Sequence, residues 1–143
     1  MVKKIVIAIS FLACATIARD DKVLMPLEKV LASEAFKEKV GDKIKFTFAD
    51  TTLPVEAVSL GSTKTSQKTS RVGKKDSVAC EWVFLSAMIA LKNKAIQEKA
   101  DAVMGIMSNY KNIEFPSSTS YECHVGAMMA GVALKGTLVK IAK

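Results

Sequence analysis

One segment in the middle of the chain constrains the fold more than any other feature. A helical pattern runs over residues 76–100, and between Val78 and Leu91 its only clearly polar side chains are Glu81 and Ser86. A helix this apolar must be covered by other elements over most of its surface. At about 100° per residue, one stripe of the helix, which we expect to pack on a sheet, carries Cys80, Phe84, Met88, Leu91 and Ala95.

Alternating patterns on both sides of this helix predict the sheet. Residues 43–48 alternate strictly, with Ile44, Phe46 and Phe48 on one side and lysine or threonine on the other. A short amphipathic helix is predicted to begin at Pro26. Further strands are predicted at 55–60, 102–107, 121–125 and 132–141, the last one interrupted by Gly136. This order predicts an α+β fold with about five strands, one long buried helix and a short N-terminal helix.

The start of the chain predicts an export leader. Residues 1–18 combine a basic start, an apolar run over 5–13 and the small residue Ala18 before a charged stretch, which is typical of a secretory signal peptide. We therefore expect a single domain over 19–143 in the periplasm or outside the cell. Cys14 leaves an alternative open, because it lies in a degenerate lipoprotein motif. Lipidation of Cys14 would anchor the protein in the envelope and is the condition on which we expect membrane association.

Removal of the leader leaves two cysteines, Cys80 and Cys123, and an exported protein usually oxidises such a pair. Cys80 lies on the inner stripe of the helix, and period-two alternation places Cys123 on the face opposite Glu122. Both side chains then point to one helix–sheet interface, which predicts a disulfide. The alternative is a metal site formed by Cys80, Cys123 and His124, which is disfavoured because neighbouring strand residues point to opposite faces. No cofactor is expected.

The excess positive charge of the protein is concentrated in one segment. The chain has 21 Lys and Arg against 14 Asp and Glu, and Lys3 and Lys4 leave with the leader. The segment 61–75 is rich in serine and threonine and contains no acidic residue, which predicts a flexible loop. Its five cations are candidates for binding an anionic lipid surface or an acidic envelope protein: Lys64, Lys68, Arg71, Lys74 and Lys75. Nucleic acid is not an expected partner, because the segment has no aromatic residue on which a base could stack.

Motifs of common catalytic sites are missing from the chain. The segment Val72–Lys75 lacks the upstream glycine and the Ser or Thr of a P-loop, and there is no Gly-x-Ser-x-Gly elbow. The single histidine, His124, lies beside Glu122 on the outer side of a predicted strand, where we expect a surface residue without a nucleophile partner. We therefore expect no enzymatic activity and, in particular, no ATPase.

Three parts of the sequence carry a resemblance to known families: Lys74–Ala87, Lys99–Lys111, and Tyr121–Gly126 together with Ala130–Gly136. They resemble a family of small exported bacterial proteins that is often labelled "excinuclease ATPase subunit". The Lys-Ala-Asp-Ala-Val-Met-Gly-Ile element over 99–106 is also similar to YbjQ-like heavy-metal-binding domains and to the sensor lipoprotein of the Rcs envelope-stress phosphorelay.

These resemblances imply an α+β sandwich in which the helix packs on a curved, mostly antiparallel sheet. Because every strong feature of the sequence is structural or electrostatic, we expect a non-catalytic binding or accessory module of the envelope or periplasm. The YbjQ-like resemblance implies the alternative, a metal-binding or metal-responsive protein. Excinuclease or ATPase activity is not expected, since the nucleotide loop that it requires is absent.

Overall fold

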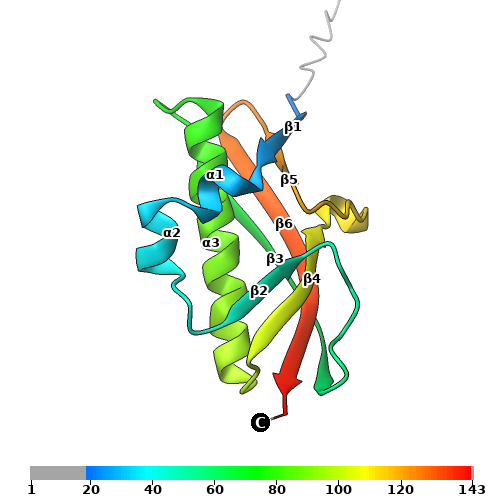
Figure 1. Cartoon of the computed structure of the whole chain (residues 1–143). Helices are drawn as coiled ribbons and strands as arrows, with labels where there is room; N and C mark the ends of the chain where they lie inside the picture. The colour runs from blue at the N-terminus through cyan, green and yellow to red at the C-terminus, as the bar shows by residue number, and fades with distance from the viewer. Residues whose placement is uncertain (1–18, 143) are drawn as a thin grey trace, which may run out of the picture.

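The computed structural model describes residues 19–142, so the predicted signal peptide and Cys14 lie outside the described residues. The described part is one six-stranded sheet with a long helix and shorter helices (Figure 1). The elements in chain order are β1 (Asp21–Pro26), α1 (Leu27–Leu31), α2 (Glu34–Lys39), β2 (Lys45–Phe48), β3 (Ala57–Ser70), α3 (Asp76–Gln97), β4 (Ala102–Ser108), the 3-10 helix η1 (Tyr110–Asn112), β5 (Ser120–Val125) and β6 (Met129–Ile141). The predicted α+β class is confirmed, with six strands in place of about five.

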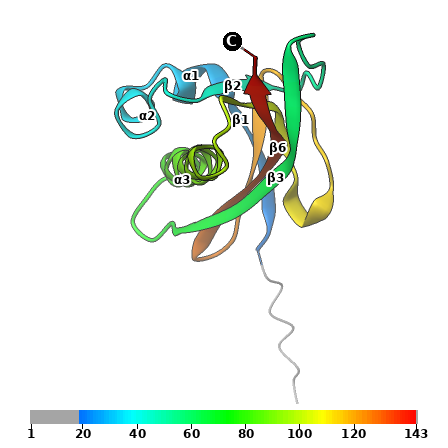
Figure 2. The ribbon, with the colours of Figure 1, turned by 90° about the horizontal axis from the view of Figure 1, so that it is seen from below.

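Strand β6 organises the sheet. It pairs along its whole length with β3 on one side, and on the other side with β5 near its start and with β4 further on. Strand β1 pairs with β5 and β2 with β4, and β2–β4 is the one parallel pair among the described strands. Figure 2 shows the sheet curving around α3, with no α-helix on the other face of the sheet among the described residues.

Helix α3 lies in the hollow of the sheet and fills the core. The five residues of the predicted inner stripe are each at most 1 % exposed, which confirms that prediction. Phe84 stacks on Tyr121 of β5 with 4.2 Å between ring centroids. Cys80 forms a disulfide with Cys123 of β5, with 5.8 Å between their Cα atoms, so the predicted bridge is present. The helix is thus joined to the sheet both by packing and covalently.

The N-terminal part differs from the single helix that the sequence predicts. Residues 21–26 form β1, and the helical region is divided into α1 and α2. Ser33 has extended backbone angles, and its Oγ accepts a hydrogen bond from the Phe36 N–H at 3.2 Å, which caps α2. The cap starts a new helix at Glu34, so the two helices cannot continue as one.

The segment 61–75 is not the flexible loop that we predicted. Residues up to Ser70 belong to β3, and each residue from Gly61 to Ser70 has a partner on β6. Thr65, Gln67 and Thr69 lie opposite Leu134, Val132 and Ala130, which face the helix. The alternating β-branched threonines favour a strand, and only the turn from Arg71 to Lys75 remains outside it.

Two glycines lie where β4 pairs with β6. Gly105 has a φ of +65° at the irregularity in the β4–β6 pairing. At Gly136, a Cβ atom would lie 2.8 Å from Cγ1 of Val103. Gly136 therefore does not interrupt the last strand, contrary to the prediction from the sequence. Strand β6 is continuous, and the glycine is required there because a side chain would not fit.

Candidate functional site

A polar groove runs along the face of the sheet opposite α3. Its floor is formed by the outer side of β3 and β6, and its wall is the segment 109–114, which contains η1. Two adjoining hollows of about 280 and 300 Å³ share Lys64, Asn109 and Asn112, and a third of about 280 Å³ lies beside Lys68 and Tyr110. We call this surface the outer groove. In Figure 2 the η1 segment and α3 lie on opposite sides of the curved sheet.

The cations of the outer groove come from three separate segments. Lys64 and Lys68 lie on β3, opposite Lys135 and Gly131 of β6, and they have no hydrogen-bond or ion-pair partner among residues 19–142. Lys111 of η1 lies 3.7 Å from an oxygen of Asp20. Because opposed residues of an antiparallel pair share a face, the lysines on β3 and β6 point to the same side of the sheet.

The wall of the groove has an unusual backbone. Lys111 and Asn112 have φ values of +52° and +60°, so two successive non-glycine residues adopt the left-handed conformation. This conformation is disfavoured for residues that carry a Cβ atom. Strained backbone of this kind is concentrated at functional sites in proteins. The strain presents the Lys111 and Asn112 side chains to the hollows that they line.

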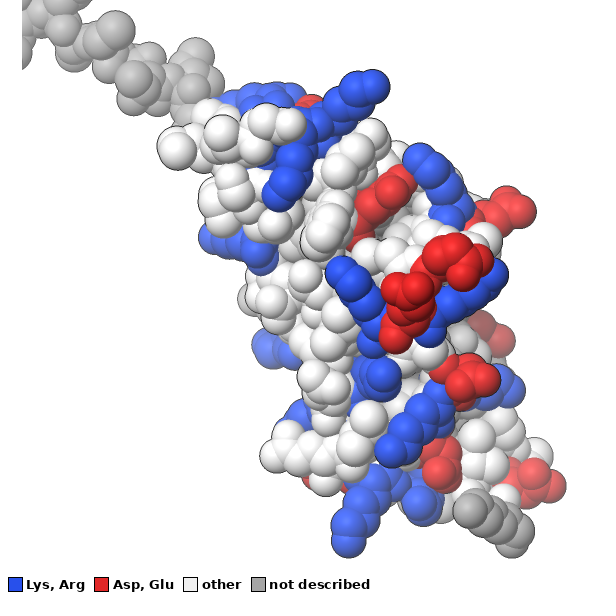
Figure 3. Space-filling view, turned by 90° about the vertical axis from the view of Figure 1, so that its left-hand side faces the viewer, with Lys and Arg blue, Asp and Glu red and all other residues white. Residues whose placement is uncertain are grey.

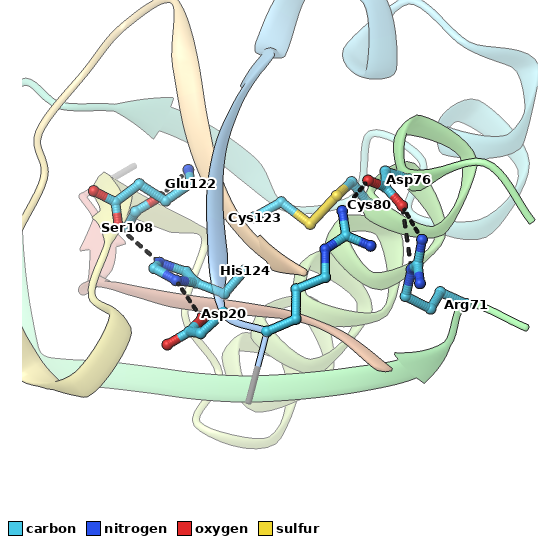
Figure 4. The surroundings of a disulfide bond; sticks show 9 residues. Asp20, Arg71, Asp76, Cys80, Ser108, Glu122, Cys123 and His124 are labelled. Carbon is cyan, nitrogen blue, oxygen red and sulfur yellow. Dashed lines mark hydrogen bonds and ion pairs between the residues drawn. A yellow bond between two sulfur atoms is a disulfide. The ribbon is translucent and has the colours of Figure 1, made fainter. Parts of the chain in front are cut away.

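His124 closes one end of the groove, and it is less exposed than the sequence predicts. Its Nδ1 lies 3.4 Å from Asp20 Oδ1, and its Nε2 lies 3.2 Å from Glu122 Oε2 (Figure 4). Its ring stacks on Tyr110 with 3.4 Å between centroids. Only 12 % of the His124 side chain is exposed. The prediction of a surface histidine is therefore wrong, because Tyr110 and Asp20, distant in sequence, cover it.

Both ring nitrogens of His124 face carboxylates. Ser108, the nearest candidate hydroxyl on β4, accepts a hydrogen bond from the backbone N–H of Glu122 at 2.9 Å and is 3 % exposed. Among the described residues, no hydroxyl or thiol forms a hydrogen bond with the His124 ring. The arrangement joins β1, β5 and η1 and shapes the end of the groove.

The five basic residues predicted as one anion site are divided between two places. Lys64 and Lys68 belong to the outer groove, whereas the other three lie in the turn before α3. Arg71 is engaged, since its guanidinium donates to Asp76 at 2.6 Å and to the Ala127 carbonyl at 2.9 Å. The hydrogen bond from Arg71 lowers the pKa of Asp76. Lys74 Nζ donates to the Ser70 carbonyl at 3.2 Å, and Lys75 is the N-cap residue of α3.

The alternative metal set is not brought together. Cys80 and Cys123 are joined in the disulfide, so neither offers a thiolate. Figure 4 shows His124 pointing toward Asp20 and Glu122, while Cys123 points the other way, toward α3. Within residues 19–142 no cluster of three or more His, Cys, Asp or Glu has the geometry to hold a metal ion.

Sequence reasoning missed most of the outer groove. It selected Lys64 and Lys68, but neither the wall residues Asn109, Lys111 and Asn112 nor Lys135. The polar stretch that follows the buried strand β4 could have indicated the wall residues, because loops at strand ends often carry binding residues.

No family model matches the chain, and neither the curated proteins nor the solved structures contain a match. The resemblances drawn from the sequence therefore stay predictions. In the part of the chain that the structure describes, none of the helices has the length and apolar character needed to cross a membrane.

Proposed function

We propose that the protein is a non-catalytic binding module of the cell envelope that holds an extended acidic segment of a partner protein in the outer groove. The observation that carries the proposal is the row of hollows on one sheet face, lined by lysines from three segments and by the side chains of Asn109 and Asn112. Lysines attract and orient acidic groups, and amide side chains provide both donors and acceptors.

The charge balance of the groove favours an acidic ligand. Its lining acids are Asp20 and Glu114, and each forms an ion pair with a lysine, Asp20 with Lys111 and Glu114 with Lys135. Lys64 and Lys68 retain uncompensated charge as far as the described residues extend. Four residues along a strand span about 13 Å, so these two lysines suit acidic side chains at similar spacing on an extended chain.

The scaffold supports a rigid site. Strands β3 and β6, which form the floor, pair over residues 57–70 and 129–141, and the disulfide fixes the opposite face of the sheet to α3. A buried disulfide is typical of proteins outside the reducing cytosol. It agrees with the export that the N-terminal residues predict.

Export is tested by intact-mass measurement of protein recovered from the envelope fraction. We expect a chain that begins at Arg19, without residues 1–18. A diacylated or triacylated chain that begins at Cys14 would replace the periplasmic location by a lipid anchor, and an unprocessed cytosolic chain would contradict the proposed export altogether.

Binding is tested with a fluorescently labelled decaglutamate peptide, whose anisotropy is followed as protein is added. We expect binding that weakens steeply with salt. The groove variant Lys64→Gln/Lys68→Gln should bind about tenfold more weakly at low salt. The control variant Lys92→Gln/Lys94→Gln removes the same charge from α3 and should bind like the wild type. Equal losses in the two variants, or no binding by the wild type, would contradict the proposed function.

A further inference from the structure

A second surface lies at the end of the molecule where the chain enters the fold. Figures 1 and 2 agree that the start of β1, the turn between β3 and α3 and the turn between β5 and β6 lie together at this end. Arg19 belongs to it through its ion pairs with Asp21 and Asp76. We call it the N-terminal end and define it by residues 19, 71–75 and 126–129. The C-terminus and the start of β3 lie at the opposite end (Figure 1).

Backbone and side-chain hydrogen bonds hold the two turns side by side. The Arg71 N–H donates to the Met128 carbonyl at 3.0 Å, and the Arg71 guanidinium donates to the Ala127 carbonyl at 2.9 Å. Ser70 and Met129 form the last pair of the β3–β6 ladder. The tips of the two turns therefore form one continuous surface.

This surface exposes large apolar side chains at its tips. Val72 is 67 % exposed, Met128 66 % and Met129 44 %. They come from two turns that are adjacent in space but separated by more than fifty positions in the sequence. Lys74 and Lys75 follow Val72 after Gly73 and are also exposed. Figure 3 shows lysine and arginine side chains beside uncharged surface at this end.

The acids at the N-terminal end are neutralised by arginines. Arg19 lies 2.7 Å from Asp21 and 2.9 Å from Asp76, and Arg71 also pairs with Asp76. Lys74 and Lys75 have no acidic partner within the described residues. The surface thus combines protruding apolar tips with net positive charge.

We propose that the N-terminal end docks on an anionic lipid bilayer, with Val72 and Met128 entering the headgroup region and Lys74 and Lys75 contacting lipid phosphates. Apolar side chains flanked by lysines are the combination that binds peripheral proteins to acidic membranes. A bilayer also suits the place where the chain begins its fold. A lipid on Cys14, the alternative to cleavage after Ala18, would lie only a few residues before Arg19 and would bring this end to the membrane.

The third hollow of the outer groove adjoins the N-terminal end, because Arg19, Gly126 and Met129 line it. The inference does not depend on the groove, because the docking residues Val72, Lys74, Lys75 and Met128 line none of its three hollows. Bilayer docking leaves the β3–β6 surface open for a protein ligand. The two proposals are therefore tested with separate variants, and either one can be refuted without the other.

The test is sedimentation with vesicles of phosphatidylglycerol and phosphatidylcholine, using protein expressed from the full-length chain in an exporting host. We expect the wild type to bind these vesicles and to bind vesicles of phosphatidylcholine alone much more weakly. The variants Lys74→Gln/Lys75→Gln and Val72→Ser/Met128→Ser should each lower the partition coefficient about tenfold. Because all four side chains are exposed or on turns, thermal unfolding midpoints should stay close to that of the wild type.

Two control variants remove the same kinds of side chain from other parts of the surface. Lys92→Gln/Lys94→Gln removes two charges from α3, and Val55→Ser removes an apolar side chain that is fully exposed in the loop before β3. Both should bind vesicles like the wild type, as should the groove variant Lys64→Gln/Lys68→Gln. If the wild type fails to bind the acidic vesicles, or if the variants of the N-terminal end bind as strongly as the controls, bilayer docking by this end is refuted.

Discussion

Reduction of the Cys80–Cys123 disulfide gives the sharpest test of how the fold is stabilised. The bridge closes a chain segment with a sequence separation of 43 residues. In the chain-entropy treatment, releasing a loop of this length increases the entropy of the unfolded state enough to lower the free energy of unfolding by about 4 kcal/mol at 25 °C. Reduction removes no side-chain heavy atom, so it leaves no cavity at the bridge.

This free energy converts into a measurable shift of the unfolding midpoint. An unfolding entropy of about 2.1 cal/mol/K per residue gives about 260 cal/mol/K for the described domain, so 4 kcal/mol corresponds to about 15 °C. The assay is thermal unfolding by circular dichroism, with oxidised protein compared with protein reduced in denaturant and refolded in the presence of a thiol. Reduced protein that unfolds within about 3 °C of the oxidised form would refute the chain-entropy argument for this bridge.

Three further variants test local features of the fold. Gly136→Ala should destabilise the protein by about 1–3 kcal/mol in urea unfolding, because its Cβ would lie 2.8 Å from Val103. Lys99→Gly should stabilise the protein by about 0.5–1 kcal/mol, since Lys99 has a φ of +57° just beyond the C-cap of α3. The expected result is a higher midpoint of urea unfolding. Arg71 lowers the pKa of Asp76 from its ordinary value of 3.8. Ionised Asp76 therefore stabilises the fold above pH 3.8, and this stabilisation is lost as the pH falls through the lowered pKa. Asp76→Asn should therefore lower the thermal midpoint at neutral pH, with a difference from the wild type that closes in acid.

The elements dominated by burial could be predicted from the sequence. The stripe on α3 was identified because one helix face must be apolar to pack on a sheet, and the same reasoning placed Cys80 opposite Cys123. Strands β4 and β5 were found because their residues are nearly all buried.

The polar elements could not be predicted in the same way. Strand β3 carries lysine and serine toward solvent and threonine and glutamine toward the helix. Its composition is therefore that of a loop, and only its pairing with β6 identifies it as a strand. Strand β1 is short and ends at Pro26, which is also a common first residue of a helix. The burial of His124 depends on Tyr110, whose place is set by the course of the chain after β4.

The candidate site was hidden for a related reason. The outer groove combines β3, the wall around Lys111 and Asn112, and β6 near Lys135, and each segment by itself has an ordinary polar sequence. Their convergence is a result of the sheet order, in which β6 lies between β3 and the end of β4. Only three-dimensional structure brings these residues to one surface.

The central claim, that the outer groove is the binding surface for an acidic segment, is tested most directly by NMR. Backbone amide signals of the isotopically labelled protein are followed as decaglutamate peptide is added. The account predicts that the largest shifts fall in residues 62–68, 109–114 and 131–135, and that added salt reverses them. Shifts confined to the turns at the N-terminal end or to α3, or no shifts under low-salt conditions, would contradict it.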